Sequence, residues 1–167
     1  PFFVRSANVE RIDSYSHDCE AILVPGEGKI GSIFHYVNGK FDVHQRVYAI
    51  TDLDQTMDGR FLFWYMRQFF GPHALEQTVK ATVDSLRRPT FVGFTMRVPR
   101  SRFEQRRIAA ALTDADDLIS ALERLIVKKE AIKQGMMQEL LSGQTRLPEF
   151  DGAGHWRPLE LRSICEV

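Results

Sequence analysis

Residues 99–143 constrain the fold more strongly than any other part of the chain, because they suit a single long helix. After Pro99 the stretch holds no further proline, and Gly135 is its one glycine before Gly143. Apolar residues recur at alternating steps of four and three, the heptad pattern of a helix that packs along one stripe. The predicted stripe consists of Ile108, Leu112, Ala115, Ile119, Leu122, Ile126, Ile132, Met136 and Leu140.

A helix of this length needs a packing partner. About 40 residues span roughly 60 Å at about 1.5 Å per residue, and the mixed sequence before the helix is too short to cover such a stripe. The stripe drifts between Ile126 and Ile132 as a straight helix drifts relative to a strict heptad, so one continuous helix is expected. We therefore expect a second helix to pack along it.

Residues 1–98 have the mixed pattern of a small α/β domain. An Asn-Gly pair inside an apolar run is a strong signal for a β-hairpin turn, so a hairpin is expected around Asn38 and Gly39. The other expected elements are strands at 21–24, 47–50 and 91–98 and a short helix at 61–70 that ends at Gly71-Pro72. Residues 144–167 are expected to be a linker followed by the opening of another unit. The predicted fold class is α+β.

The glycines of the stretch "PGEGKIGS" have the spacing of a dinucleotide-binding fingerprint. Gly26, Gly28 and Gly31 follow an apolar run, as that motif requires. The fingerprint also requires a helix directly after its last glycine, where the pyrophosphate binds. Here a β-branched and aromatic run follows Gly31, so the motif fails its structural test and no nucleotide cofactor is expected.

A second pattern in the same region resembles the acidic residues and lysine of metal-dependent nucleases. Asp18, Glu27 and Lys29 are the residues concerned, and such sites use two acids to hold a metal ion near the attacking water. The pattern is short, and glycines on both sides of Glu27 suit a turn better than a rigid strand. A nuclease is therefore the least favoured alternative, and no metal or catalytic residue is expected.

Composition leaves several functions open. The chain has 22 basic and 22 acidic residues, so its net charge does not favour a nucleic acid or a membrane, although a local basic surface can still bind DNA. Cys19 and Cys165 belong to no disulfide or metal pattern, so a reducing cytoplasm is expected. No apolar run approaches the length of a membrane span, and no membrane association is expected.

The helical stretch resembles the conserved region of the specificity subunits of type I restriction-modification systems. In that family Glu-Gln, here Glu104-Gln105, begins a long helix. The matching segments at its end are Lys128-Lys129, Lys133–Gln138, Leu140–Gly143 and Arg146–Pro148. The upstream segments "AILVPGEGKIGSIFHY" and "TVKATVDSLRRPTFVGFTMRVPRSRFEQ" look more loosely like pieces of a target recognition domain.

The resemblance implies a non-catalytic subunit that recognises DNA. In the family, two recognition domains each read one half of a bipartite sequence, and two antiparallel helices space them and dock the modification subunits. It implies a target recognition domain at 1–98 with its front part missing, a spacer helix at 99–143, and a linker with the opening of a recognition domain at 144–167. We interpret the chain as a fragment, or as a half-subunit that dimerises.

The expected partners are double-stranded DNA, the modification and restriction subunits, and a second spacer helix from the same subunit or from a homodimer partner. Polar and basic side chains near the glycine loop can contact phosphates and base edges. The candidate DNA-binding residues are Arg5, Ser6, Asn8, Lys29, Ser32, His35, Tyr36, Gln45, Arg46, Lys80 and Arg87. The main alternative is an oligomerisation and docking module for a DNA methyltransferase that does not itself read sequence.

Overall fold

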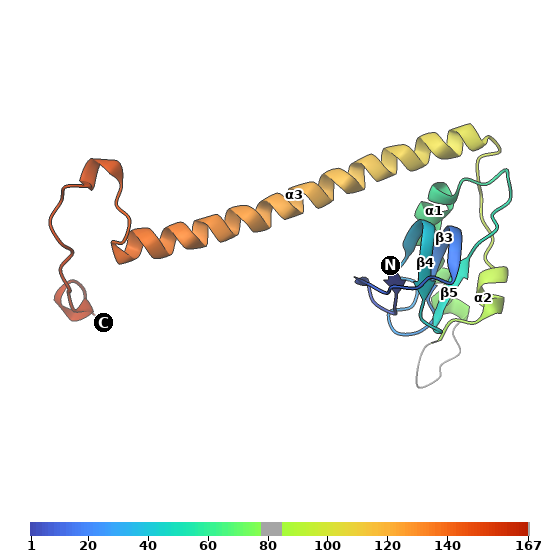
Figure 1. Ribbon diagram of the computed structural model, residues 1–167, viewed down its shortest axis with the longest axis horizontal. Coiled ribbons are helices and arrows are strands. Elements are labelled where there is room, and N and C mark those ends of the chain that lie inside the picture. Colours follow the sequence, from blue (N-terminus) through green and yellow to red (C-terminus); the bar gives the residue numbers. More distant parts are fainter. Residues whose placement is uncertain (78–84, 167) are drawn as a thin grey trace. The chain divides into compact units, whose positions relative to one another are not determined.

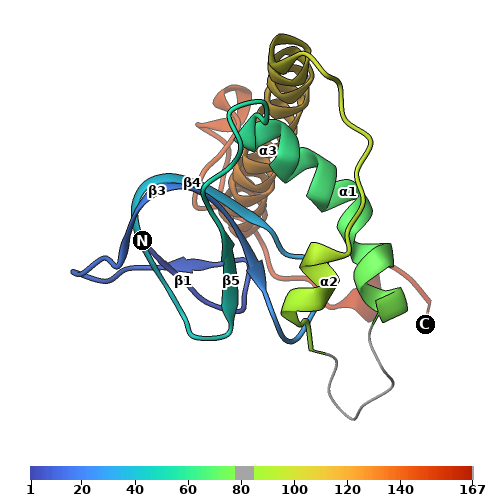
Figure 2. The same cartoon turned by 90° about the vertical axis from the view of Figure 1, so that its right-hand side faces the viewer.

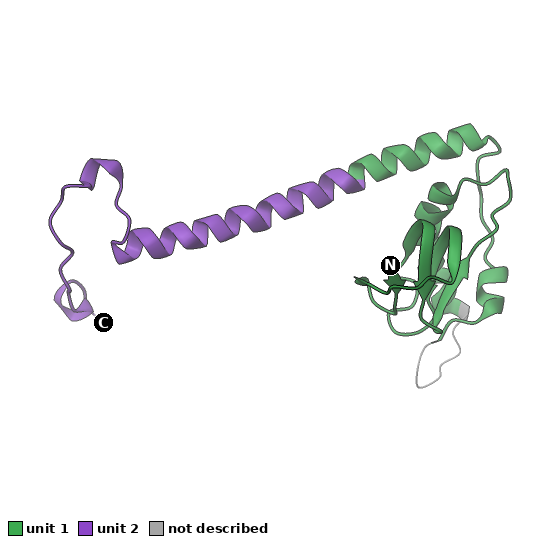
Figure 3. Ribbon diagram, viewed as in Figure 1, with its two compact units in different colours: residues 1–115 green, residues 116–167 purple. Residues whose placement is uncertain are grey.

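The computed structural model describes residues 1–77 and 85–166. The chain divides into two compact units, residues 1–115 and residues 116–167, which Figure 3 colours separately. The long helix α3 (Arg102–Ser142) contributes its first turns to the first unit and its remainder to the second. Together with the sheet of the first unit, this helix confirms the predicted α+β class.

The first unit is built on a five-stranded mixed sheet with the order β2-β1-β4-β3-β5. Figure 1 labels its strands β3, β4 and β5. The β1–β4 pair is parallel and the other neighbouring pairs are antiparallel. The strands are β1 (Phe2–Phe3), β2 (Val9–Glu10), β3 (His17–Pro25), β4 (His35–Val43) and β5 (Val47–Ile50). The expected strands at 21–24 and 47–50 are therefore present, within β3 and as β5.

Strand β3 lies between β4 and β5 and is buried on both faces. Residues 21–24 are all fully buried, and alternate side chains enter two different apolar clusters. Ile22 and Val24 pack with residues of α1 (Gly59–Gln77), which lies beside the sheet in Figure 2. Ala21 and Leu23 belong to the second cluster. A strand covered on both faces has a continuous apolar sequence, which explains the run that precedes the glycine loop.

The predicted hairpin turn at Asn38-Gly39 is wrong. Both residues lie within β4, where Gly39 pairs with Cys19 and Asn38 pairs with Glu20. The chain reverses direction earlier, in the loop between β3 and β4. The antiparallel ladder that runs from His17 to Leu23 of β3 satisfies many backbone groups at once, and these bonds outweigh a local two-residue turn preference.

The helix predicted to stop at Gly71-Pro72 continues to Gln77. Pro72 removes one helical hydrogen bond, but Phe70 and Ala74 on either side of it are fully buried, and this packing outweighs the loss. The strand predicted at 91–98 is also wrong, because residues 88–92 form the short helix α2 (Arg88–Val92) with a proline in its first turn. There the Phe91 ring stacks on Phe70 with centroids 5.0 Å apart.

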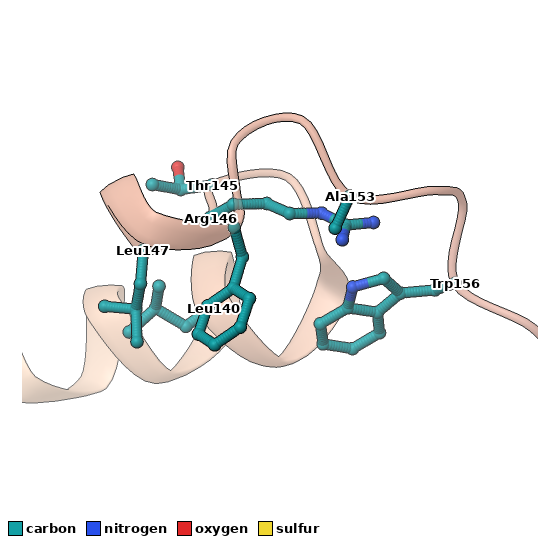
Figure 4. Close-up of a pocket in the computed structure, with 7 residues that line it drawn as sticks. Leu140, Thr145, Arg146, Leu147, Ala153 and Trp156 are labelled. Atoms are coloured by element: carbon teal, nitrogen blue, oxygen red, sulfur yellow. The ribbon is translucent and has the colours of Figure 1, made fainter.

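In the second unit, the chain turns back at the end of α3. Gly143 has a left-handed φ of 73°, and the short 3-10 helices η1 (Pro148–Phe150) and η2 (Leu161–Ser163) follow. The Arg146 guanidinium donates to the Gly154 carbonyl oxygen at 2.9 Å and lies 5.8 Å from the centroid of the Trp156 ring. Arg146, Trp156 and Leu140 are among the residues that line a small, mostly apolar pocket (Figure 4). Among the described helices, none is long and apolar enough to cross a membrane.

Candidate nucleic-acid interface

A polar cleft of about 470 Å³ opens on the first unit where three segments meet. These are the two residues that follow β3, the turn into β5 with the start of that strand, and the segment before α2. Its lining consists of Gly26, Glu27, Gln45, Arg46, Val47, Tyr48, Ser85, Leu86 and Arg87. Three candidate DNA-binding residues, Gln45, Arg46 and Arg87, therefore share one surface although more than 40 positions separate Gln45 from Arg87.

Backbone hydrogen bonds around Gly26 hold the three segments together. The Gly26 N–H donates to the Arg46 carbonyl oxygen at 2.8 Å, and the Leu86 N–H donates to the Gly26 carbonyl oxygen at 2.7 Å. The Tyr48 hydroxyl also donates to the Leu86 carbonyl oxygen at 3.0 Å. A Cβ at position 26 would lie 2.8 Å from the Tyr48 ring. Glycine is therefore needed here for close packing against Tyr48.

Glu27 organises the positive charge of the cleft. Its two carboxylate oxygens lie 2.8 Å from an Arg46 nitrogen and 3.3 Å from an Arg5 nitrogen. The arginine side chains remain more than half exposed, so these ion pairs add little stability. They do hold two guanidinium groups near the cleft, where Arg87 adds a third. Guanidinium groups bind phosphate and the guanine edge through two parallel hydrogen bonds.

The arrangement of Glu27 differs from that expected of a metal ligand, because both its oxygens face arginine. Within residues 1–77 and 85–166, no group of three or more histidine, cysteine, aspartate or glutamate residues is placed to hold a metal ion. The sequence alone suggests for Glu27 only the role of an acid in a nuclease pattern. The glycines on both sides of Glu27 indicate a turn in the sequence, but nothing in the sequence predicts that Glu27 contacts Arg5 and Arg46.

Three other candidates, Ser6, Asn8 and His35, form a separate group near β1. A ring nitrogen of His35, Nε2, lies 3.1 Å from the Ser6 carbonyl oxygen. The Asn8 N–H donates to the Ser6 hydroxyl oxygen at 3.2 Å. Ser6 and Asn8 are exposed, and His35 is half-buried against Phe3 with ring centroids 5.1 Å apart. Part of their polar capacity is thus used to order the connection between β1 and β2.

Tyr36 faces the opposite side of the sheet from His35, because successive strand residues alternate. Its hydroxyl donates to Glu20 Oε1 at 2.6 Å, and the Arg60 guanidinium lies 4.5 Å from its ring centroid. Burial, followed by the hydrogen bond to Glu20, raises the pKa of Tyr36 to about 12. The hydroxyl is therefore committed to a partner within the fold, and the ring packs against the cluster shared with α1.

The rest of the glycine loop carries Lys29 and Ser32. Lys29 is exposed, and the Ser32 hydroxyl donates to the Lys29 carbonyl oxygen at 2.7 Å, which closes a local turn. Gly31 has a φ of 66° and lies against Gly71 of α1. Strand β4 and not a helix follows the loop, as expected from the sequence. Lys80, the remaining candidate, lies outside the described residues.

No family model matches this chain. It is 31% identical over 134 residues to the Type I restriction enzyme EcoDI specificity subunit of Escherichia coli. The match covers 80% of the chain but only 28% of that protein.

Solved structures show the same fold. The S subunit of a Type-I restriction-modification system from M. genitalium superposes with a TM-score of 0.67 at 19% identity, over 84% of this chain and 38% of that one. A second solved structure describes complex assembly and conformational transition of the type I R-M system. A chain of that structure superposes with a TM-score of 0.65 at 19% identity, and the match covers 87% of the present chain and 38% of the solved one.

A mixed sheet domain that continues into a long helix is thus a fold that this chain shares with these two chains of type I restriction-modification systems. In sequence, this chain is similar to the specificity subunit of a type I restriction enzyme, and the resemblance expected from the sequence is confirmed. The chain spans about a quarter of the curated relative's length.

Proposed function

We propose that this chain is a non-catalytic, DNA-reading part of a type I restriction-modification enzyme. Its target recognition domain, residues 1–98, reads one half of a bipartite target, and its spacer helix, residues 99–143, docks the modification subunits. Residues 144–167 lead into a further recognition domain. The observation that carries the proposal is the similarity, over 80% of the chain, to a specificity subunit.

The chemistry of the polar cleft supports DNA binding. Arginine at positions 5, 46 and 87 supplies cationic donors for phosphate, and Gln45 supplies an amide that can pair with adenine. Lys29 on the neighbouring loop adds a flexible cation. Phosphate contacts provide affinity that depends on salt, whereas the amide and guanidinium groups provide base selectivity. The other candidate residues, around Ser6 and His35, form a second polar group near β1.

The exposed stripe of α3 supports pairing with a second helix. Ile119, Leu122 and Ile126 are 55%, 49% and 56% exposed. The stripe is also symmetric about Leu122: Ile108 and Met136 each lie 14 residues away from it, and Leu112 and Ile132 each lie 10 residues away. An antiparallel helix of the same sequence therefore places large apolar residues opposite one another at these positions, whereas Ala115 faces Lys129.

Charge favours the same antiparallel arrangement. The segment 114–117 carries three aspartates before Leu122, and Lys128, Lys129 and Lys133 follow it. Antiparallel pairing about Leu122 brings the acidic segment of one helix near the basic segment of the other, whereas parallel pairing places like charges together. The second helix comes from the same subunit or from a homodimer partner.

The proposal is tested by selection from a random duplex DNA pool, with the chain bound to its cognate modification subunits. Two enriched short motifs at a fixed spacing are expected. Mirror-related motifs identify a homodimer of half-subunits, and unrelated motifs identify one longer subunit. Salt-dependent binding without an enriched motif contradicts sequence reading and favours the docking module that does not read DNA.

A further inference from the structure

Gln105, in the first turn of α3, is a buried polar residue with every polar group of its amide engaged. Its side chain is 1% exposed. The oxygen Oε1 accepts from the Asp58 N–H at 2.8 Å, and Nε2 donates to the Pro99 carbonyl oxygen at 2.8 Å and to the Thr56 carbonyl oxygen at 3.2 Å. These partners join the start of α3 to the loop before α1 and to the segment before α3.

Asp58 links the beginnings of the two helices. Its carboxylate accepts from the Phe61 N–H at 3.1 Å at the start of α1, and it forms an ion pair with Arg106 of α3 at 3.3 Å. Two turns further along α3, the Trp64 indole N–H of α1 donates to the Thr113 hydroxyl oxygen at 3.1 Å. Directional polar contacts from α1 and its preceding loop therefore hold the first turns of α3 at several points.

Apolar packing between α1 and the start of α3 is incomplete. An open pocket of about 590 Å³ lies there, and its wall is mostly apolar, with Phe61, Trp64 and Phe69 on one side and Ile108 and Leu112 on the other. Close packing of side chains normally determines the angle between two helices. Because close packing between α1 and α3 is interrupted by this pocket, the direction of α3 depends more strongly on hydrogen bonds, whose geometry is restricted.

We propose that Gln105 is a positioning residue that fixes the direction in which α3 leaves the recognition domain, and so determines the allowed separation of the two DNA half-sites. This inference rests on the proposed function. The 41 residues of α3 span roughly 60 Å, and a tilt of about 10° at the start of such a helix moves its far end by roughly 10 Å, or about three base pairs. A small loss of angular definition at Gln105 therefore becomes a measurable change in spacing.

The experiment uses the chain assembled with its modification subunits and a set of duplexes in which the selected half-sites are separated by different numbers of base pairs. In Gln105→Leu the side chain keeps its approximate size but loses all three hydrogen bonds. We expect unchanged half-site motifs and at least a threefold weaker preference for the best spacer over spacers one base pair longer or shorter. Gln55→Leu is the matched control, because Gln55 is an exposed glutamine of the loop before α1 and lies outside the spacer helix.

Arg106→Ala gives a graded test, since it removes the ion pair with Asp58 and leaves the three hydrogen bonds of Gln105 in place. An intermediate spacer preference is expected. If Gln105→Leu does not fold, Arg106→Ala provides the comparison. Folded variants with the spacer preference of the unsubstituted chain overturn the inference. If the unsubstituted chain enriches no motif, the proposed function fails, and the inference fails with it.

Discussion

Gly31→Ala tests the role that the structure gives to the glycine loop. A Cβ at position 31 would lie 2.5 Å from the Gly71 Cα and 3.3 Å from the Gly71 backbone nitrogen, so the loop or the helix must move. Gly31 also has a φ of 66°, which an L side chain rarely adopts. Gly28 provides the matched control: its φ is 89°, but no atom lies within 4 Å of the position of its Cβ.

The expected losses of unfolding free energy differ between the two glycines. Backbone strain costs about 1–3 kcal/mol in each variant. Overpacking against a rigid helix backbone adds about 1–3 kcal/mol for Gly31→Ala alone. Gly31→Ala is therefore expected to destabilise the first unit by about 2–6 kcal/mol and Gly28→Ala by about 1–3 kcal/mol.

Urea denaturation followed by Trp64 fluorescence measures both losses. The chain has two tryptophans, so a Trp156→Phe background restricts the signal to the first unit. A larger loss for Gly31→Ala, with an unchanged dependence on urea concentration, supports the close approach of the loop to α1. Equal losses in the two variants refute it, because backbone strain would then account for both.

Three further results are expected. Replacement of Lys29 or Arg87 by alanine lowers DNA affinity and flattens the plot of log affinity against log salt by about 0.9 for each phosphate that the variant no longer binds. The exposed Arg124→Ala is the control, and an unchanged slope argues against phosphate binding by the replaced residue. The pKa of Tyr36 in the folded protein, about 12, lies above the ordinary value of 10, so the stabilisation by the neutral hydroxyl is complete below pH 10 and is lost as pH rises toward 12. Denaturation at a series of pH values is expected to show a smaller decline in unfolding free energy over this range for Tyr36→Phe than for the unsubstituted chain. Leu122→Ala weakens pairing with a second helix by about 2–5 kcal/mol if that residue is buried there, with little effect on the melting of the isolated chain, and sedimentation that shows unchanged assembly contradicts the stripe.

The sequence predicted elements whose stability depends on their own pattern more successfully than it predicted turns. The long helix was visible because its heptad repeat persists over many turns, and the strand at 21–24 because its apolar run is continuous. The turn at Asn38-Gly39 and the stop at Gly71-Pro72 rested on local preferences of about 1–3 kcal/mol. Pairing along β3 and burial of Phe70 overrode both.

The candidate site was predictable by residue type but not by grouping. Arginine, lysine and glutamine near a glycine loop indicated contact with nucleic acid, and Gln45, Arg46 and Arg87 line one cleft. The same residue-type argument predicts DNA contact for Tyr36. Side chains alternate between the two faces of β4, however, so Tyr36 packs on the α1 side of the sheet and its hydroxyl donates to Glu20. Side-chain direction depends on strand register, which is a property of the paired sheet.

By itself, the sequence determined that this protein has a long helix with an apolar stripe and a strand at 21–24, and it carried the relationship to specificity subunits. These features depend on residues close together in the chain or on a repeating pattern. Only the tertiary structure decided that Glu27 pairs with Arg5 and Arg46, that Gly31 packs on Gly71, and that Gln105 bonds to the loop before α1. Each is a contact between residues far apart in sequence, and such contacts arise when the sheet and helices bury a common core.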